Sequence, residues 1–416
     1  MNYVDRYQRP KKQRRSHKAA ILTFILVVGL VGAYVSYALQ RTLPTLLPSS
    51  SALNLRSGTG VSQLTWPTSG QSAVAVEHTN IIQTHGTQTP VAIASTAKVI
   101  TALVVMQKQP IKLGQAGPTI TLTDADAALY NSYVSQEGSV VPVSAGEQIT
   151  EYQMLEALML PSSNNLADSL AIWAFGSLDA YKAGADQYLL QLGLHDTHVG
   201  SDASGFSPST TSTAHDLVII GKLAMDDPVL RQIVGMASTT DIPQLGSVRN
   251  VNSLLGSNNI IGIKTGNTDQ AGGVYLSAST RQVDSQSLTI ITALVGAPTL
   301  SAALNDSLPL VTSAQANIVT TRLLAKHAII GEYRQPWGGI IPAAAQTELT
   351  TPAWRGSTAT AHVSLQPLSP SVQAGQVVGN ASTPKTSFGT AKKTDIILLQ
   401  TPTKPSTWWR LLHPLD

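Results

Sequence analysis

Cysteine is absent from the 416 residues of this chain, which excludes disulfide bonds and a lipid-modified cysteine. Aromatic residues are scarce, at 5%, and charged residues make up only 12%. Hydrophobic residues nevertheless reach 43%, so the chain is long and apolar enough for more than one buried core. We therefore expect a folded protein of several domains that is stabilised by packing alone.

Positive charge is concentrated at the N-terminus. Residues 1–18 hold seven basic residues and one acidic residue, a net charge of seven minus one, or +6, against +3 for the whole chain. The remaining residues are therefore acidic overall, and the basic pI reflects a short tail. A role in binding nucleic acid loses its main support.

A hydrophobic run follows this tail. Residues 19–39, AAILTFILVVGLVGAYVSYAL, are 21 residues without a charge, the length of a transmembrane helix. Basic residues before the run place residues 1–18 in the cytoplasm and everything after Leu39 outside. A secretory signal peptide is the alternative, because Ser36 to Ala38 resemble a small-residue cleavage site. The sequence favours a single-pass anchor in the cell membrane with an extracytoplasmic body.

The rest of the chain divides into four segments. Residues 40–65, rich in Ser, Thr, Leu and Pro, indicate a linker. Residues 66–332 carry strand-like runs at both ends of a long helical middle, which predicts a sheet of sequence-distant strands with a helical lobe. Residues 333–402 show short alternating segments typical of a small β domain. Residues 403–416 form a tail whose paired tryptophans either dock on a membrane interface or cover an edge of the β domain.

Two polar residues interrupt an apolar segment, IASTAKVITALVV at residues 93–105. If this segment is helical from about Ser95, then Ser95 and Lys98 are neighbours at i and i+3. The hydroxyl lies in the first turn, where backbone N–H groups favour developing negative charge. An N-cap serine with a lysine that reaches solvent is the structural alternative, so further motifs have to decide.

Two further motifs follow in order. The segment LMLPSSNNLADSLA supplies Ser162 and Asn164 at a break between two helical stretches. The segment IIGIKTGNTDQAGG supplies Lys264, Thr265 and Gly266 at the end of a strand-like run, where glycine allows close backbone approach. Each motif alone is common, whereas all three in this order are far more specific.

With these motifs the chain resembles the serine penicillin-recognising enzymes, and most closely the low-molecular-weight D-alanyl-D-alanine carboxypeptidases. The resemblance covers residues 66–332 and implies an α+β, β-lactamase/transpeptidase-like catalytic domain with an antiparallel sheet and a helical lobe. It implies peptidoglycan stem peptides as substrates, β-lactam antibiotics as acylating inhibitors, and neither cofactor nor metal. The β domain at 333–402 resembles the second domain that these enzymes often carry.

The resemblance implies roles for the catalytic residues. Ser95 is the nucleophile, and a serine hydroxyl needs an adjacent base. Lys98 is that base, with a pKa lowered by burial and by Lys264. Ser162 relays the proton to the leaving amine.

The same resemblance implies a substrate-binding set. Asn164 holds the substrate's amide, while Lys264 and Thr265 meet its terminal carboxylate. The backbone N–H of Asn267, together with that of the nucleophile, forms an oxyanion hole. Gly266 lies between them.

Other polar residues carry weaker signals. His195 and His198 in LHDTHVG have no carboxylate or second histidine cluster at ligand spacing, so they indicate loop histidines and no metal site. Asp202 in SDASGFSPST indicates a turn residue that shapes the rim of the cleft.

Three alternatives to a carboxypeptidase stay open. A class A β-lactamase shares the motifs but needs a glutamate-activated water, and no glutamate lies between Glu156 and Glu332. A catalytically silent wall-binding protein would not require all the motif residues. A D,D-endopeptidase acting on cross-links is the third.

The endopeptidase alternative comes from a departure from the family pattern. These carboxypeptidases commonly place an arginine three residues before an acid, beyond the strand that follows Lys-Thr-Gly, where it helps to hold the free carboxylate. Here Ala303 stands three residues before Asp306. Unless Arg281 or an arginine from another loop substitutes, the sequence predicts only modest removal of terminal D-alanine.

Overall fold

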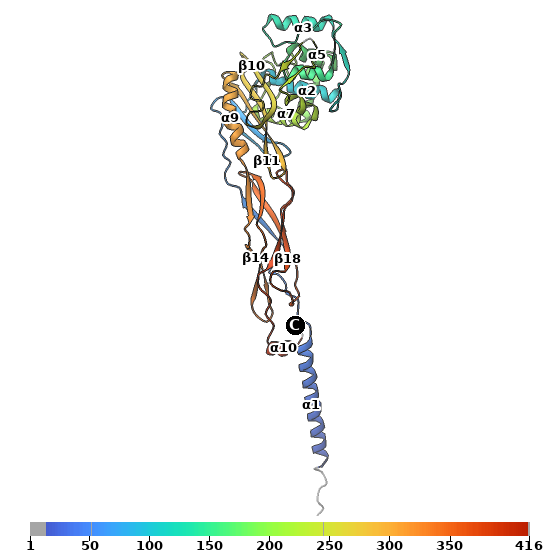
Figure 1. Cartoon of the computed structure of the whole chain (residues 1–416), viewed down its shortest axis with the longest axis vertical. Helices are drawn as coiled ribbons and strands as arrows, with labels where there is room; N and C mark the ends of the chain where they lie inside the picture. Colours follow the sequence, from blue (N-terminus) through green and yellow to red (C-terminus); the bar gives the residue numbers. More distant parts are fainter. Residues whose placement is uncertain (1–13, 51, 244, 415–416) are drawn as a thin grey trace, which may run out of the picture.

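The computed structural model describes residues 14–50, 52–243 and 245–414. They form an elongated molecule, with helix α1 (Arg14–Gln40) at one end, a β-rich region in the middle and a mixed α/β body at the other end (Figure 1). The cytoplasmic tail predicted at 1–18 lies mostly outside the described residues, and its last residues are already part of α1.

The body is built on an antiparallel sheet in the order β10-β11-β12-β2-β3. Its strands are β2 (Gln71–Val76), β3 (Ile82–His85), β10 (Ile260–Thr268), β11 (Gly272–Val283) and β12 (Gln286–Ala297). Strands from distant parts of the sequence pair side by side, β2 with β12, as the sequence predicts. Strand β12 is a nearly continuous apolar run because both of its faces are covered.

Two helices cover the two faces of this sheet. Ile291 of β12 lies against Gly221 of α7 (Ala214–Asp226). The preceding residue, Ile290, packs with Leu310 of α9 (Leu300–Ala316) on the other face, as the strand period of two requires.

The helical lobe surrounds α2 (Ala97–Lys108), whose residues from Ala97 to Met106 are all buried. A helix that is apolar on every side belongs in a core. The other helices of the lobe are α3 (Asp124–Ser135), α4 (Glu151–Met159), α5 (Asn164–Phe175), α6 (Leu178–Gln191) and α8 (Pro228–Val234). Short helices η1 (Ala94–Thr96) and η2 (Ser257–Asn259) and three two-stranded ribbons complete the body: β4 (Val91–Ala92) with β7 (Thr211–Ser212), β5 (Thr119–Thr121) with β6 (Gln148–Thr150), and β8 (Ser238–Thr239) with β9 (Val248–Arg249).

The β region contains a six-stranded antiparallel sheet in the order β1-β17-β18-β19-β15-β14. Its strands are β1 (Ala52–Gly58), β14 (Ile329–Arg334), β15 (Ile340–Ala345), β17 (Thr358–Leu365), β18 (Val377–Ser382) and β19 (Lys393–Leu398). Strand β13 (Ile318–Leu324) pairs separately with β16 (Leu349–Trp354). The fold is therefore α+β with a separate β region, as the sequence predicts.

The structure differs from the sequence expectation between residues 40 and 65. Residues 52–58 of the expected linker form strand β1, which pairs with β17 along its whole length. Only Leu53 and Leu55 mark the alternation of this edge strand, a pattern too short to distinguish from a loop. The expected domain boundary at 332/333 also falls inside β14.

The body and the β region share a core where they meet. Leu310 of α9, Ile318 of β13 and Trp354 of β16 pack with Val76 and Ile290 of the body's sheet. Because α9 ends at residue 316 and β13 begins at 318, no flexible segment separates them.

Helix α1 is long and apolar enough, over His17–Gln40, to cross a membrane, and its apolar side chains are exposed. A signal sequence near the N-terminus has the same properties. The tail at 403–416 forms α10 (Thr407–Leu412), which packs beside the C-terminal end of α1 (Figure 1).

Candidate active site

The nucleophile candidate lies in η1, immediately before α2. Ser95 Oγ accepts a hydrogen bond from Lys98 Nζ at 2.9 Å. The lysine side chain is fully buried, because α2 carries it into the centre of the lobe. The i, i+3 spacing therefore brings the pair together as predicted.

Lys98 makes two further hydrogen bonds. Its Nζ donates to Asn164 Oδ1 at 2.7 Å and to the carbonyl oxygen of Ser204 at 3.0 Å. Burial lowers the pKa of Lys98 well below its ordinary value, and the nearby charge of Lys264 lowers it further. A neutral amine next to a serine hydroxyl is able to accept the hydroxyl proton.

Ser162 lies in the turn between α4 and α5. Its backbone has φ of 67°, a conformation that non-glycine residues seldom adopt. The next residue, Ser163, is the N-cap of α5 and accepts from the N–H of Leu166. Ser162 is buried, and among the described residues none forms a hydrogen bond with its hydroxyl.

Strand β10 brings the third motif against the nucleophile. A Cβ placed on Gly266 would lie 3.2 Å from the Ser95 nitrogen and 2.9 Å from the Ile93 oxygen, so only glycine fits. Lys264 is buried, donates to the Thr265 oxygen at 3.1 Å, and has a pKa lowered by burial to about 7. Asn267, the residue after Gly266, is exposed near the end of the strand.

A buried acid behind the site is missing from the sequence prediction. Asp168 accepts from the Tyr133 hydroxyl and from the N–H of Ala203, both at 2.7 Å. Burial raises the pKa of Asp168 to about 6. It lies four residues after Asn164 on the same side of α5, but this i, i+4 spacing alone does not single it out, because its partners come from other segments.

The loop between α6 and α7 carries Ser204, whose carbonyl oxygen accepts a hydrogen bond from Lys98. Asp202 accepts from the backbone N–H groups of Ser204, Phe206 and Ser207, so it is a turn residue, as the sequence indicates. On another side of the site, Gly138 lies directly against the side chain of Asn164. A Cβ on Gly138 would be only 2.8 Å from Asn164 Nδ2.

His195 and His198 do not belong to the group of side chains around Lys98. In the part of the chain that the structure describes, the one group of histidine and carboxylate side chains close enough to share a metal is Glu77, His78 and Asp226. Its Glu77 is already paired with Arg231.

The arginine position of the family pattern is apolar here. Ala303 is buried on α9 and packs with Tyr275, which lies opposite Thr265 on the neighbouring strand. Arg281 lies on β11 six residues after Tyr275, opposite Leu288. At the rise of a β-strand this is about 20 Å along the sheet from the Thr265–Tyr275 pair. It therefore cannot substitute.

Comparisons with known proteins agree with this geometry. A family model described as D-alanyl-D-alanine carboxypeptidase matches residues 59–299, more than half of the chain. D-alanyl-D-alanine carboxypeptidase DacA of Escherichia coli K12 is 31% identical over 229 residues, covering 53% of this chain and 53% of that protein. The relative DacB2 of Mycobacterium tuberculosis is 33% identical over 193 residues, covering 45% and 62%. The matches thus span little more than half the length of these relatives.

Solved structures show the same fold. Penicillin binding protein 5 from Haemophilus influenzae superposes with a TM-score of 0.56 at 20% identity, covering 82% of this chain and 98% of that one. The Streptomyces K15 DD-transpeptidase gives 0.53 at 23% identity, covering 60% and 98%. The fold is therefore transpeptidase-like, and with the family model matched across all three motifs, the chain belongs to the D-alanyl-D-alanine carboxypeptidase family of hydrolases.

Proposed function

We propose that this chain is a membrane-anchored serine-type D-Ala-D-Ala carboxypeptidase that trims peptidoglycan stem peptides through an acyl-enzyme on Ser95. The observation that carries the proposal is the hydrogen bond of 2.9 Å between the fully buried Lys98 Nζ and Ser95 Oγ. Family membership supports the substrate class and the binding of β-lactams.

Acylation begins when Ser95 Oγ attacks the carbonyl carbon of the penultimate D-alanine and its proton moves to neutral Lys98. The oxyanion accepts hydrogen bonds from the backbone N–H groups of Ser95 and Asn267, an arrangement usually worth a few kcal/mol. Ser162 passes its hydroxyl proton to the leaving amine as the C–N bond breaks and takes up the proton that Lys98 holds, which returns Lys98 to its neutral form. Terminal D-alanine departs with its carboxylate opposite Lys264 and Thr265.

Deacylation reverses the proton path. A water attacks the ester carbonyl, gives its proton to Lys98, and releases the shortened stem while Ser95 regains its hydrogen. Asn164 has two roles: its Oδ1 accepts from Lys98, which leaves Nδ2 to donate to the substrate's amide.

A β-lactamase is less well supported. The carboxylates whose charges act on Lys98 are Asp202 and Asp168, and both accept hydrogen bonds from the protein. No glutamate lies between Glu156 and Glu332 to activate a water. We therefore infer slow release of a penicillin adduct.

The alanine at position 303, where the family pattern has arginine, favours a second activity, D,D-endopeptidase cleavage of cross-links. Without an arginine fork, the site gains less from a free terminal carboxylate. A substrate whose scissile bond is followed by more peptide is then less disfavoured than in a site that has the arginine.

The contacts of α10 support retention of α1 as an anchor. Arg410 Nη1 donates to the Leu39 oxygen at 2.8 Å, and the Tyr34 hydroxyl donates to the Leu411 oxygen. Arg41 lies over the Trp409 ring at 5.6 Å. Cleavage after residue 38 would remove part of this contact. The N-terminus is then cytoplasmic and the body extracytoplasmic.

The test is mass spectrometry after incubation with a labelled penicillin. The adduct should map to Ser95 and be absent from Ser95→Ala, while Ser285→Ala, an exposed serine in the turn between β11 and β12, keeps it. An adduct on another residue would refute the proposed nucleophile, and wild-type hydrolysis within seconds would favour the β-lactamase.

A further inference from the structure

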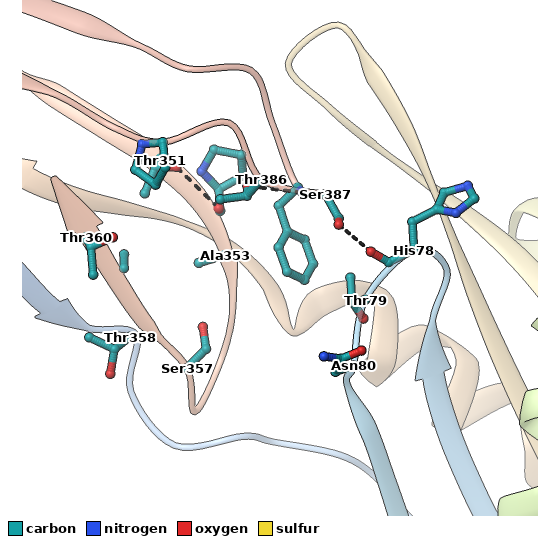
Figure 2. Close-up of a pocket in the computed structure, with 14 residues that line it drawn as sticks. His78, Thr79, Asn80, Thr351, Ala353, Ser357, Thr358, Thr360, Thr386 and Ser387 are labelled. Atoms are coloured by element: carbon teal, nitrogen blue, oxygen red, sulfur yellow. Dashed lines mark hydrogen bonds between the residues drawn. The ribbon is translucent and has the colours of Figure 1, made fainter. Parts of the chain in front are cut away.

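A second concave surface lies away from the active site, where the body meets the β region (Figure 2). It holds about 440 Å³ between the β2–β3 turn, strands β16 and β17, and the loop after β18. A second hollow of about 400 Å³ continues across β1, β17 and β18. The two share Thr360 and Pro384, and together we call them the waist groove.

The lining of the waist groove mixes polar and apolar side chains and carries no negative one. Figure 2 shows Ser357, Thr358 and Thr360 on one side and Thr79 and Asn80 on the other. The continuation adds basic and amide side chains, namely Asn54, Arg56 and His362. Among the described residues that line either hollow there is no aspartate or glutamate, so no lining carboxylate attracts a cationic ligand.

Several lining side chains have no hydrogen-bond partner among the described residues. The side chains of Asn80, Thr358, Thr360 and Arg56 are exposed, and none forms a hydrogen bond with another described residue. Arg56 and Thr360 are cross-strand partners on one face of the sheet. They therefore present a guanidinium and a hydroxyl side by side to a ligand.

The walls of the groove are fixed before any ligand arrives. The Ser387 hydroxyl donates to the His78 oxygen across the boundary between the body and the β region (Figure 2). Nearby, Lys392 Nζ lies 2.7 Å from Asp284 Oδ2, and Lys222 Nζ donates to the Thr79 oxygen at 2.8 Å. A preformed groove binds without the cost of ordering its walls.

We propose that the waist groove binds a saccharide chain, the glycan strand to which stem peptides are attached; this rests on the proposed function. Sugars present hydroxyl and acetamido groups, which match the unpartnered hydroxyls of the groove and Asn80. Arg56 is placed to donate to the carbonyl oxygen of an acetamido group, and to a sugar carboxylate wherever the stem peptide has been removed. Phe388, which lines the first hollow, offers the apolar surface against which the C–H face of a pyranose ring packs.

Peptide-free glycan strands, prepared from peptidoglycan with an amidase, are the probe, and isothermal titration calorimetry with the full chain in detergent is the measurement. Arg56→Glu and the double variant Thr358→Val/Thr360→Val should each weaken binding at least tenfold. Lys326→Glu, an exposed cation in the turn after β13, is the charge-matched control and should bind like the wild type. Thermal unfolding checks that each variant folds.

Three results would overturn the proposal: no binding by the wild type, equal binding by all variants, or equal binding of poly-L-glutamate, which would reduce the groove to a general anion site. A second readout separates this proposal from the proposed function. The groove variants should cleave a soluble pentapeptide normally but release D-alanine from intact sacculi several-fold more slowly. If the wild type cleaves neither substrate, the proposed carboxypeptidase activity is refuted. The calorimetry then still tests whether the waist groove binds glycan.

Discussion

Asn164 and Asp168, one turn apart on α5, fix the surroundings of Lys98 from two sides. Asn164 Oδ1 accepts from Lys98 Nζ at 2.7 Å. Asp168 accepts from the N–H of Ala203 at 2.7 Å, and the carbonyl of the next residue, Ser204, accepts from Lys98 at 3.0 Å. The position and the pKa of Lys98 therefore depend in part on Asp168, an acid that the sequence alone does not single out.

Asp168→Asn should shift the acidic limb of the acylation profile to lower pH. The negative charge of Asp168 raises the pKa of Lys98, and its removal lets that pKa fall further. Neutral Lys98 then persists at lower pH. Stopped-flow acylation by a penicillin across pH 5 to 9 measures the limb, with exposed Asp179→Asn as control. A loss of rate with an unshifted limb would leave Asp168 a purely structural role.

Lys264→Met should shift the same limb in the opposite direction. Below its pKa of about 7, Lys264 is charged and lowers the pKa of Lys98. With methionine of similar volume the Lys98 pKa rises, so acylation requires higher pH. The overall rate should also fall, because the carboxylate loses a partner. Lys108→Met at the end of α2 is the control, and a shift to lower pH would contradict the assignment.

Gly266→Ala should fold but acylate at least tenfold more slowly. The added Cβ would contact the Ile93 oxygen at 2.9 Å and push β10 away from Ser95. A tenfold loss corresponds to about 1.4 kcal/mol of transition-state stabilisation. Gly58→Ala on β1, where a Cβ meets nothing within 4 Å, is the matched control. Equal acylation rates in the two variants would show that β10 does not position the site.

The protein purified from membranes should retain α1. Intact-mass spectrometry should give a chain that includes residues 14–40, since α10 contacts the last turns of that helix. Arg410→Ala and Trp409→Ala should loosen the contact and make the tail more sensitive to added protease, whereas exposed Lys404→Ala should not. A mature N-terminus just after Ala38 would establish a signal peptide instead.

The ratio of kcat/KM on a pentapeptide stem to that on a cross-linked dimer should be low. Ala303 stands where the family pattern has arginine, and the missing charge-assisted hydrogen bonds are worth about 1–3 kcal/mol. Ala303→Arg should raise the ratio toward the pentapeptide, with exposed Ser301→Arg as the control. A wild type that strongly prefers the pentapeptide would show that the arginine is not needed.

The sequence predicts the site better than its surroundings. Ser95 and Lys98 are within one helical turn, so local geometry alone brings them together. The sheet is also predictable, because β2 and β12 are long apolar runs. Asp168 escapes notice because its partners, Tyr133 and Ala203, come from distant segments that only the fold brings near. The roles of Ser162 and Asn267 stay predictions.

In the β region, the sequence predicts the individual strands but not how the sheet and its groove are assembled. Its alternating strands are evident in the sequence, but the recruitment of residues 52–58 into its sheet is not, since an edge strand with two inward leucines leaves a weak pattern. The waist groove is likewise invisible, because its walls come from residues 54–80 and 351–388 and each wall is ordinary surface by itself.

Helix α9 leads directly into β13, and Trp354 and its neighbours pack over this junction. The junction therefore limits how the catalytic body can move relative to the β region. With α1 in a bilayer, the β region is a stiff spacer, and the catalytic cleft stays at one height above the lipid surface. Under the function proposed above, only stem peptides within a thin layer of wall at that height are within reach of the cleft. The length of the spacer then limits which substrates the cleft meets, in addition to the chemistry of the cleft.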